Sequence, residues 1–142
     1  MVTAARRVWF ELPVFGTIAL GGAVGAASRY EITQAWDRSP TGFPWAIFTI
    51  NLIGCALIGV LMVLVEERIS RHRLVRRFLG IGLLGGFTTF SSYALDIEQL
   101  SRAGAETTAA IYLAATVFGA LLAVTLGIMA TSAVLRFRRR IR

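Results

Sequence analysis

The run Phe87–Tyr93 places two threonines and two serines directly behind a stretch rich in glycine. Glycines weaken a helix, and the hydroxyl groups of threonine and serine cap the start of a new one. We therefore predict a break in the backbone near Gly85–Thr89, with a half-helix on each side. Carbonyl groups at the end of the first half can bind a cation, and amides at the start of the second favour an anion. Alternatively, Gly82 and Gly86, four residues apart, merely allow two helices to pack closely.

Five other side chains have types and spacings that suit contact with an anion. Asn51 interrupts an apolar stretch, where its amide would bond either a neighbouring helix, which is its common role, or an anion crossing the membrane. Phe90 and Tyr93, three residues apart, share one helix face, and their ring edges are electropositive, although such aromatics usually belong to the core. Tyr112 and Thr116, four residues apart, make a polar stripe that serves either helix–helix hydrogen bonding or the ion.

The residue types on which enzymes and metal centres depend do not cluster in this sequence. The single histidine, His72, lies in an arginine-rich stretch, and the single cysteine, Cys55, lies in an apolar one. No disulfide framework, CxxC metal motif or Ser-His-Asp arrangement can be assembled from them. Arg29 ends a glycine-rich apolar stretch, and we expect it to anchor the chain at the membrane surface or to pair with an acid. We do not expect this protein to be an enzyme.

The composition indicates which elements must position these residues. The chain has 142 residues, of which 56% are hydrophobic and 16% are charged, and its mean hydropathy is +0.66. Soluble domains are about 45–50% apolar and about 25% charged. Apolar stretches that suit a bilayer, about 20 residues each, occupy approximately residues 12–30, 44–65, 78–98 and 107–135. We predict an all-α membrane protein, a single domain of four transmembrane helices with the third broken near its middle, and polar turns at Asp37–Gly42, Glu66–Arg73 and Asp96–Glu106.

All fifteen basic residues are arginines, against eight acids, and they are distributed unevenly. Nucleic-acid binders concentrate such charge on a soluble face, so no nucleic-acid partner is predicted. With four spans, the two termini and the middle turn share one side, which carries twelve arginines, whereas Arg29, Arg38 and Arg102 lie on the other. By the positive-inside rule, both termini are predicted to be cytoplasmic. We interpret the run Arg136–Arg142 as part of this topology signal rather than as a dedicated lipid-binding motif, although anionic headgroups would attract it.

Three pieces of the sequence, taken together, resemble the CrcB/Fluc family of fluoride channels. The order of the pieces, the four spans and the chain length all match, so the resemblance covers nearly the whole chain. Each piece alone is a weak signal, whereas the ordered set is specific. The pieces are Gly21–Tyr30 (GGAVGAASRY), Asn51–Gly54 (NLIG) and Gly85–Ser92 (GGFTTFSS).

The resemblance implies an antiparallel dimer of the dual-topology type, which exports cytoplasmic fluoride passively through two narrow pathways around a central structural Na⁺. The carbonyl groups of Gly85 and Thr88 would hold the Na⁺, Asn51 would donate a hydrogen bond to fluoride, and Phe90 would present a ring edge to it. The scheme agrees with ion physics, because a strongly hydrated anion needs closely placed donors and a fixed cation offsets its cost of entry. The implied anion pathway comprises Asn51, Thr89, Phe90, Ser91, Tyr93, Tyr112 and Thr116.

The sequence departs from the family pattern at several positions. Tyr93 stands where a second phenylalanine is usual, and Ala120 stands where the polar track often has a hydroxyl. Asp96 replaces the usual glutamate, Ala94 replaces a common serine, and both Asp96 and Arg29 are assigned structural polar roles. The phenol and the shortened track could leave this subunit's own pathway weak, while the dimer conducts through groups from its partner.

The arginine bias complicates an antiparallel dimer of one sequence, because that chain would have to insert in both orientations. We therefore predict a heterodimer with a homologous subunit whose charge bias is inverted, and a homodimer is the alternative. The dimer is predicted to lie among the lipids of a bacterial plasma membrane. Two other functions also fit four short helices. A small proton-coupled multidrug exporter would need a carboxylate near mid-membrane, whereas all eight acids are predicted at span ends or in turns. A non-conducting subunit that only orients a competent partner is the other.

Overall fold

The computed structural model describes residues 2–37, 39–67 and 73–141, and within these residues the chain is helical and contains no strand. The predicted all-α class is therefore confirmed. Two predicted turns fall partly outside the described residues. Residues 68–72 of the turn at Glu66–Arg73 lie outside them, and so does Arg38 of the turn at Asp37–Gly42. In order, the elements are α1 (Val2–Gln34), α2 (Trp45–Glu67), α3 (Arg73–Arg76), η2 (Arg77–Leu84), α4 (Gly85–Phe87), α5 (Phe90–Arg102) and α6 (Glu106–Arg140).

Three helical segments among the described residues are long and apolar enough to cross a membrane, namely Trp45–Glu66, Leu74–Arg102 and Glu106–Arg140. They contain the second, third and fourth predicted spans, which makes this a multi-pass membrane protein. The first predicted span lies within α1, which is not among the three. Four glycines and Arg29 fall in that stretch and lower its hydropathy. A membrane crossing by α1 stays a prediction.

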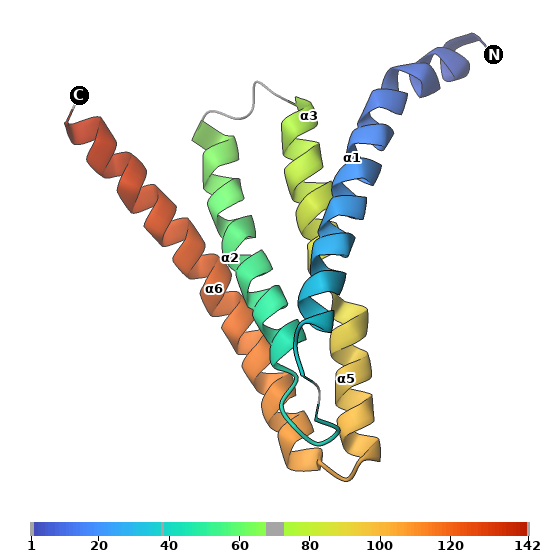
Figure 1. Cartoon of the computed structure of the whole chain (residues 1–142). Coiled ribbons are helices and arrows are strands. Elements are labelled where there is room, and N and C mark those ends of the chain that lie inside the picture. The colour runs from blue at the N-terminus through green and yellow to red at the C-terminus, as the bar shows by residue number, and fades with distance from the viewer. Residues whose placement is uncertain (1, 38, 68–72, 142) are drawn as a thin grey trace.

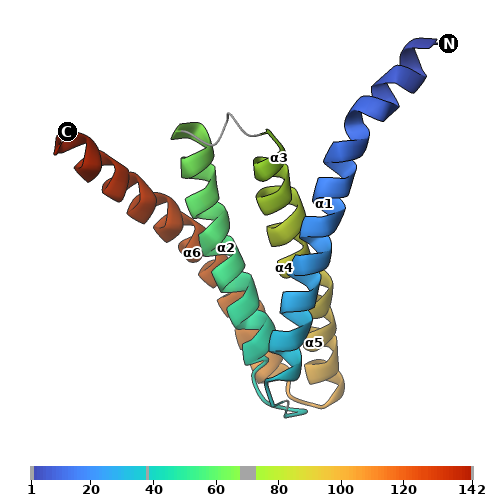
Figure 2. The same cartoon turned by 45° about the horizontal axis from the view of Figure 1, so that its top comes forward.

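The long helices run back and forth between two ends of the molecule (Figure 1). The start of α1, the end of α2, the start of α3 and the end of α6 all lie at one end. The connections from α1 to α2 and from α5 to α6 lie at the other end in both views (Figures 1 and 2). The start of α1, the facing ends of α2 and α3, and the end of α6 therefore share a side, as the four predicted spans require. Toward that side α1 and α6 diverge.

The predicted turn at residues 96–106 is wrong over most of its length, because α5 continues to Arg102. Asp96 is a buried helical residue whose carboxylate accepts a hydrogen bond from α6. Glu98 pairs with Arg102 at 2.5 Å, at the four-residue spacing that suits a helix. The actual turn is three residues long and contains Gly104, whose φ of 73° lies in the left-handed region that favours glycine.

Two pairs of helices pack at close range because glycines lie where their backbones meet. In one pair α1 runs along η2 and α4, and in the other α2 runs along α6. In the first pair, a Cβ atom on Gly82 would lie 2.7 Å from the carbonyl oxygen of Ile18. In the second pair, a Cβ atom on Gly127 would overlap the carbonyl oxygen of Ala56. Neither pair can accept a larger side chain at these positions without moving its backbone.

The buried side chains gather among α2, α5 and α6, in the half of the molecule near the short connections (Figure 1). Farther along α6 the large apolar side chains point outward, as the 70% exposure of Phe118 illustrates. Outward-facing apolar helix surfaces are what a lipid environment requires. The main buried cluster consists of Ile47, Ile50, Tyr93, Leu100, Ala109 and Tyr112.

Candidate functional site

The third span is broken at Thr88 and Thr89, within the predicted range of residues 85–89. Both residues have extended backbone, with φ and ψ of −77° and 154° at Thr88 and of −148° and 124° at Thr89. The hydroxyl oxygen of Thr89 accepts a hydrogen bond of 3.2 Å from the backbone amide of Ser92. Thr89 is thus the N-cap of α5, and the predicted capping of a new helix by a hydroxyl is confirmed.

Asn51 of α2 bonds both backbone groups of Thr89 at the break. Its Oδ1 accepts a bond of 2.9 Å from the amide of Thr89, and its Nδ2 donates a bond of 3.0 Å to the carbonyl oxygen of the same residue. Asn51 is 8% exposed, so this pair of hydrogen bonds is shielded from the surroundings. The common role of an amide between helices is therefore confirmed. A carboxamide carries two N–H donors, and this pairing uses one of them.

The break takes the ordinary helical amide partner from four carbonyl groups, those of Gly85, Gly86, Phe87 and Thr88. In a continuous helix, the amide of Thr89 would reach the carbonyl of Gly85, and the amide of Ser92 would reach that of Thr88. Here the first amide bonds Asn51 and the second bonds the Thr89 hydroxyl. The carbonyl oxygens of Gly85 and Thr88, which the family resemblance assigned to a cation, are thus two of the four that lose their helical amides.

Arg29 and Gly54 also act at the break, in ways that the sequence did not reveal. Arg29 Nε donates a hydrogen bond of 3.2 Å to the carbonyl oxygen of Gly86, which joins α1 to the last turn before the break. A Cβ atom on Gly54 would overlap the methyl group of Thr88, so this glycine lets Thr88 lie against α2. The Thr88 hydroxyl donates back to the carbonyl of Leu84 at 2.9 Å.

The glycines before the break also form the close helix contact that was the alternative interpretation. Gly86 lies against the backbone of Gly22, and Gly25 lies against the carbonyl group of Leu83. Leu83 belongs to η2, which ends just before the two glycines at positions 85 and 86. This element is a π-helix, a widened form of helix that often occurs at functional sites. The two interpretations therefore hold together, since close packing at Gly82 and Gly86 is followed by the break.

A chain of aromatic rings runs from the break into the buried cluster. Ring centroids lie 5.6 Å apart for Phe90 and Tyr93, 5.3 Å for Tyr93 and Tyr112, and 5.2 Å for Tyr112 and Phe43. Phe90 is 80% exposed, whereas Tyr93 and Tyr112 are 6% and 0% exposed. The Tyr93 hydroxyl donates to the carbonyl oxygen of Leu113 at 3.0 Å, so this phenol is tied to α6.

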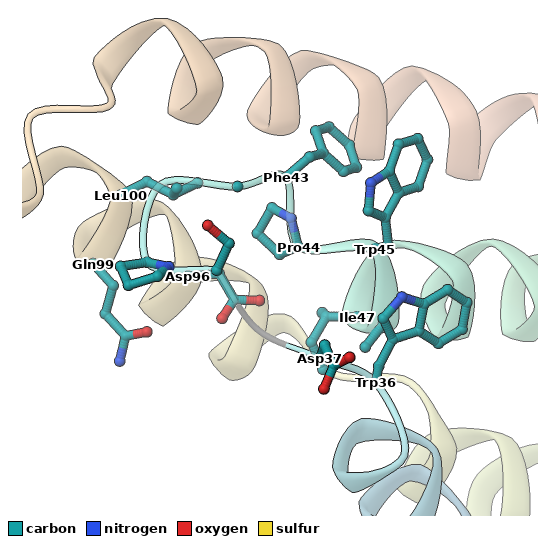
Figure 3. A pocket seen from close by; sticks show the side chains of 13 residues that line it. Trp36, Asp37, Phe43, Pro44, Trp45, Ile47, Asp96, Gln99 and Leu100 are labelled. Carbon is teal, nitrogen blue, oxygen red and sulfur yellow. The ribbon is translucent and has the colours of Figure 1, made fainter.

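A cavity of about 170 Å³ opens near the connection between α1 and α2. Asp96 of α5 and Asp37 of the connection line it, together with the rings of Phe43 and Trp45 (Figure 3). Asp96 is 5% exposed, and its Oδ2 accepts a hydrogen bond of 3.3 Å from the Tyr112 hydroxyl. The cavity and the aromatic chain thus meet at the Asp96–Tyr112 pair.

The structure divides the predicted pathway residues into an inner and an outer set. The side chain of Thr116 is buried, and its hydroxyl makes no hydrogen bond within the described part of the chain. Phe43 was missed by the sequence prediction, because only its ring contact with Tyr112, distant in sequence, reveals it. The inner set is Asn51, Tyr93, Tyr112 and Thr116, Thr89 is half-buried, and the outer set is Phe90 and Ser91.

These features define a class of protein: a helical, multi-pass membrane protein in which the segment Leu74–Arg102 is interrupted beside the buried side-chain amide of Asn51. The family described as "CrcB-like protein, Camphor Resistance (CrcB)" matches residues 16–128. The chain therefore belongs to this family, as its sequence motifs predicted.

Two relatives illustrate how closely the chain matches the family. It is 49% identical over 136 residues to the "Fluoride-specific ion channel FluC 1" of Streptomyces coelicolor, and the alignment covers 95% of this chain and 88% of the relative. It is 54% identical over 127 residues to the "Fluoride-specific ion channel FluC 2" of Nocardia farcinica, which covers 89% of this chain and 91% of the relative.

Proposed function

We propose that this chain is a subunit of a fluoride-selective channel that lets cytoplasmic fluoride leave the cell down its electrochemical gradient. The observation that carries the proposal is the break at Thr88 and Thr89, which is held open by Asn51. Non-helical backbone at membrane depth is tolerated only where protein or a polar cavity surrounds it. The relatives that align with nearly the whole chain are named fluoride-specific ion channels.

The anion would be received by groups that the fold leaves with spare hydrogen-bonding capacity. Asn51 has a second N–H, and the buried hydroxyl of Thr116 is without a bond within the described residues. Phe90 would offer its electropositive ring edge. A small anion that gives up its water requires several such donors in close succession. Tyr93 would act mainly through its ring, since its hydroxyl already bonds Leu113.

The exposed side of the break supports a dimer. Gly85, Phe90 and Ser91 are exposed in the single chain, although they belong to or adjoin the interrupted backbone. Lipid cannot satisfy such groups, so another polypeptide has to cover them. In an antiparallel dimer, the corresponding face of a homologous subunit would supply the cover, and each of two pathways would then combine the inner and outer sets.

A central Na⁺ fits the donor set found at the break. Hard monovalent cations bind oxygen ligands, and the carbonyl oxygens of Gly85 and Thr88 are among those whose helical amides are diverted at the break. These carbonyls would hold the ion where the two subunits meet. A fixed positive charge there would lower the cost of bringing an anion into a medium of low dielectric constant.

The charge bias supports a heterodimer with cytoplasmic termini. The start of α1, the end of α2, the start of α3 and the end of α6 lie at the same end of the molecule (Figure 1), and nine arginines of the described residues belong to or directly adjoin these segments. The positive-inside rule then favours a single orientation in the plasma membrane. An antiparallel partner would need the opposite bias.

The proton-coupled exporter remains the second candidate because of one observation, the buried carboxylate of Asp96. That carboxylate lies in α5 and lines the cavity near the α1–α2 connection (Figure 3). Its place near one end of the helices fits a structural hydrogen bond to Tyr112 better than a carrier site at mid-membrane.

Fluoride efflux from liposomes tests the proposal. The chain would be reconstituted alone and with a homologous subunit of opposite arginine bias, and fluoride and chloride release would be recorded after adding a potassium ionophore. We expect fluoride release without chloride release, and strong loss in Asn51→Ala and Phe90→Ile. Phe118→Ile, which alters an equally outward-facing ring on α6, is the matched control and should conduct normally.

The outcomes separate the candidates. Flux that survives both Asn51→Ala and Phe90→Ile when the partner is present would assign this chain a structural role only. Proton flux that requires a drug gradient and disappears in Asp96→Asn would establish the exporter instead. Equal labelling of terminal tags on both sides of the membrane would replace the heterodimer by a homodimer.

A further inference from the structure

Helix α6 is longer than a membrane crossing requires. Its 35 residues, Glu106–Arg140, correspond to about 52 Å at 1.5 Å per residue, against about 30 Å of hydrocarbon. No charged residue occurs between Glu106 and Arg136. The helix also diverges from α2 toward its C-terminal end in both views (Figures 1 and 2). Its last turns therefore leave the hydrocarbon at a slant and pass through the level of the headgroups.

The last two turns carry an outward apolar stripe. Val134, Phe137 and Ile141 are 58%, 65% and 70% exposed. At 3.6 residues per turn they fall on one face, within about 60° of one another. The backbone of Ile141 still has helical φ and ψ, so the face extends past the end of α6. No described part of the chain covers this stripe.

The arginines of the same segment are arranged around that stripe. By the same periodicity, Arg138 lies on one flank and Arg140 lies on the other, whereas Arg136 and Arg139 lie toward the opposite face. All four are exposed. A purely topological signal needs positive charge on the correct side of the membrane but needs no particular face. An apolar stripe flanked by arginines is the pattern of a helix that lies in a lipid interface.

We propose that residues 134–141 bind anionic phospholipids, with the apolar stripe inserted among the acyl chains and the flanking arginines on the headgroup phosphates. The apolar stripe favours a lipid surface over a soluble polyanion, which would engage the charges and leave Val134, Phe137 and Ile141 in water. Long arginine side chains reach from the flanks to the phosphates while their stems cover apolar surface. The proposal requires the chain to be in a membrane but does not depend on fluoride conduction.

A depth measurement on the full chain tests this binding. A nitroxide would be attached at Val134→Cys in a Cys55→Ser background, and the protein would be placed in vesicles of phosphatidylcholine with increasing phosphatidylglycerol. The ratio of collisions with oxygen to collisions with a nickel chelate reports the depth of the label. We expect this ratio to rise with phosphatidylglycerol, and the rise to be lost in the double change Arg138→Gln, Arg140→Gln.

Matched single changes separate a face from bulk charge. Each basic residue near an anionic surface contributes about fivefold in affinity, so Arg138→Gln should weaken the response to phosphatidylglycerol by about that factor. Arg139→Gln removes the same charge from the opposite face and should change the response far less. Circular dichroism would establish that each variant keeps its helices.

Three results would overturn the proposal. One is a label depth that is independent of phosphatidylglycerol in the parent chain. Another is an equal loss in Arg138→Gln and Arg139→Gln, which would reduce the effect to net charge. The third is a label that stays in water with phosphatidylglycerol and is immobilised by a short oligonucleotide, which would make the segment a binder of soluble polyanions.

Discussion

The two closely packed helix pairs use the same glycine contact and end in different structures. Gly25 admits the carbonyl group of Leu83 in the α1 pair, and Gly127 admits that of Ala56 in the α2–α6 pair. Nevertheless α2 and α6 are continuous helices, whereas the third span is π-helical over η2 and loses its helix at Thr88. Close glycine packing is therefore compatible with a break but does not cause one.

The difference between the pairs comes from where polar side chains place their hydrogen bonds. On α6, Thr125 and Thr131 each donate to a carbonyl one turn earlier, at 2.8 Å, so they demand nothing from another helix. At the break, Asn51 and Arg29 bond backbone groups of a different span. Interrupting a helix in a membrane is feasible when neighbouring helices supply the missing partners.

The largest effect is expected from removing the two hydrogen bonds between the Asn51 side chain and the Thr89 backbone. Asn51→Leu keeps the approximate volume but leaves the amide of Thr89 without a partner and removes one of the bonds to its carbonyl oxygen, which as the N-cap carbonyl still accepts within α5. A buried unpaired amide costs about 1–3 kcal/mol and one lost hydrogen bond about 0.5–1.5 kcal/mol, so we expect a loss of about 1.5–4.5 kcal/mol in the free energy of unfolding in detergent. Ile53→Ala, an outward-facing change on the same helix, should cost much less. Equal losses of stability in both variants would show that the Asn51–Thr89 hydrogen bonds do not stabilise the break.

Intermediate effects should distinguish the two glycine contacts. A methyl group at Gly25 or Gly127 would meet backbone oxygen, and overpacking of this kind costs about 1–3 kcal/mol. We expect both alanine variants to lower the melting temperature, but only Gly25→Ala to disturb the break and with it fluoride efflux. Gly16→Ala is the control, since nothing lies within 4 Å of its Cβ position, and it should be neutral or slightly stabilising. Normal fluoride efflux in a folded Gly25→Ala protein would disconnect the α1 contact from the break.

The smallest effect is expected at the cap of α5. Thr89→Ala removes the hydroxyl that accepts from the Ser92 amide and should cost about 0.5–2 kcal/mol of stability, measured by thermal unfolding. Thr89→Ser retains the hydroxyl and should recover most of the loss. The corresponding position before α6 is Ala105, which has no side-chain cap to lose. A Thr89→Ser protein as unstable as Thr89→Ala would show that the cap is unimportant.

The sequence predicted the break because its causes are local, whereas the partners of the break are distant. Glycines followed by Thr88 and Thr89 weaken one helix and cap the next, and this signal lies within a few residues. The two hydrogen bonds from Asn51 to Thr89 join residues 38 positions apart, and the hydrogen bond from Arg29 to Gly86 joins residues 57 positions apart. Residue types and spacing indicated that Asn51 was polar in an apolar span, but not which backbone it would meet.

The length of α5 was mispredicted for a related reason. Polar residues after Leu95 indicated a turn, since nothing in their spacing showed that Asp96 faces the hydroxyl of Tyr112. The pairing of two helices converted a polar residue into a buried one. The ring contact of Phe43 with Tyr112 was missed for the same reason.

The position of these partners along the chain also has a consequence for biosynthesis. Arg29 and Asn51 both precede the break that they complete, so both are already made when Thr88 and Thr89 leave the ribosome, which synthesises the chain from its N-terminus. The interrupted segment never has to wait in lipid for partners still to be translated. A circular permutant that begins with the third span would reverse this order and expose its unbonded backbone during insertion.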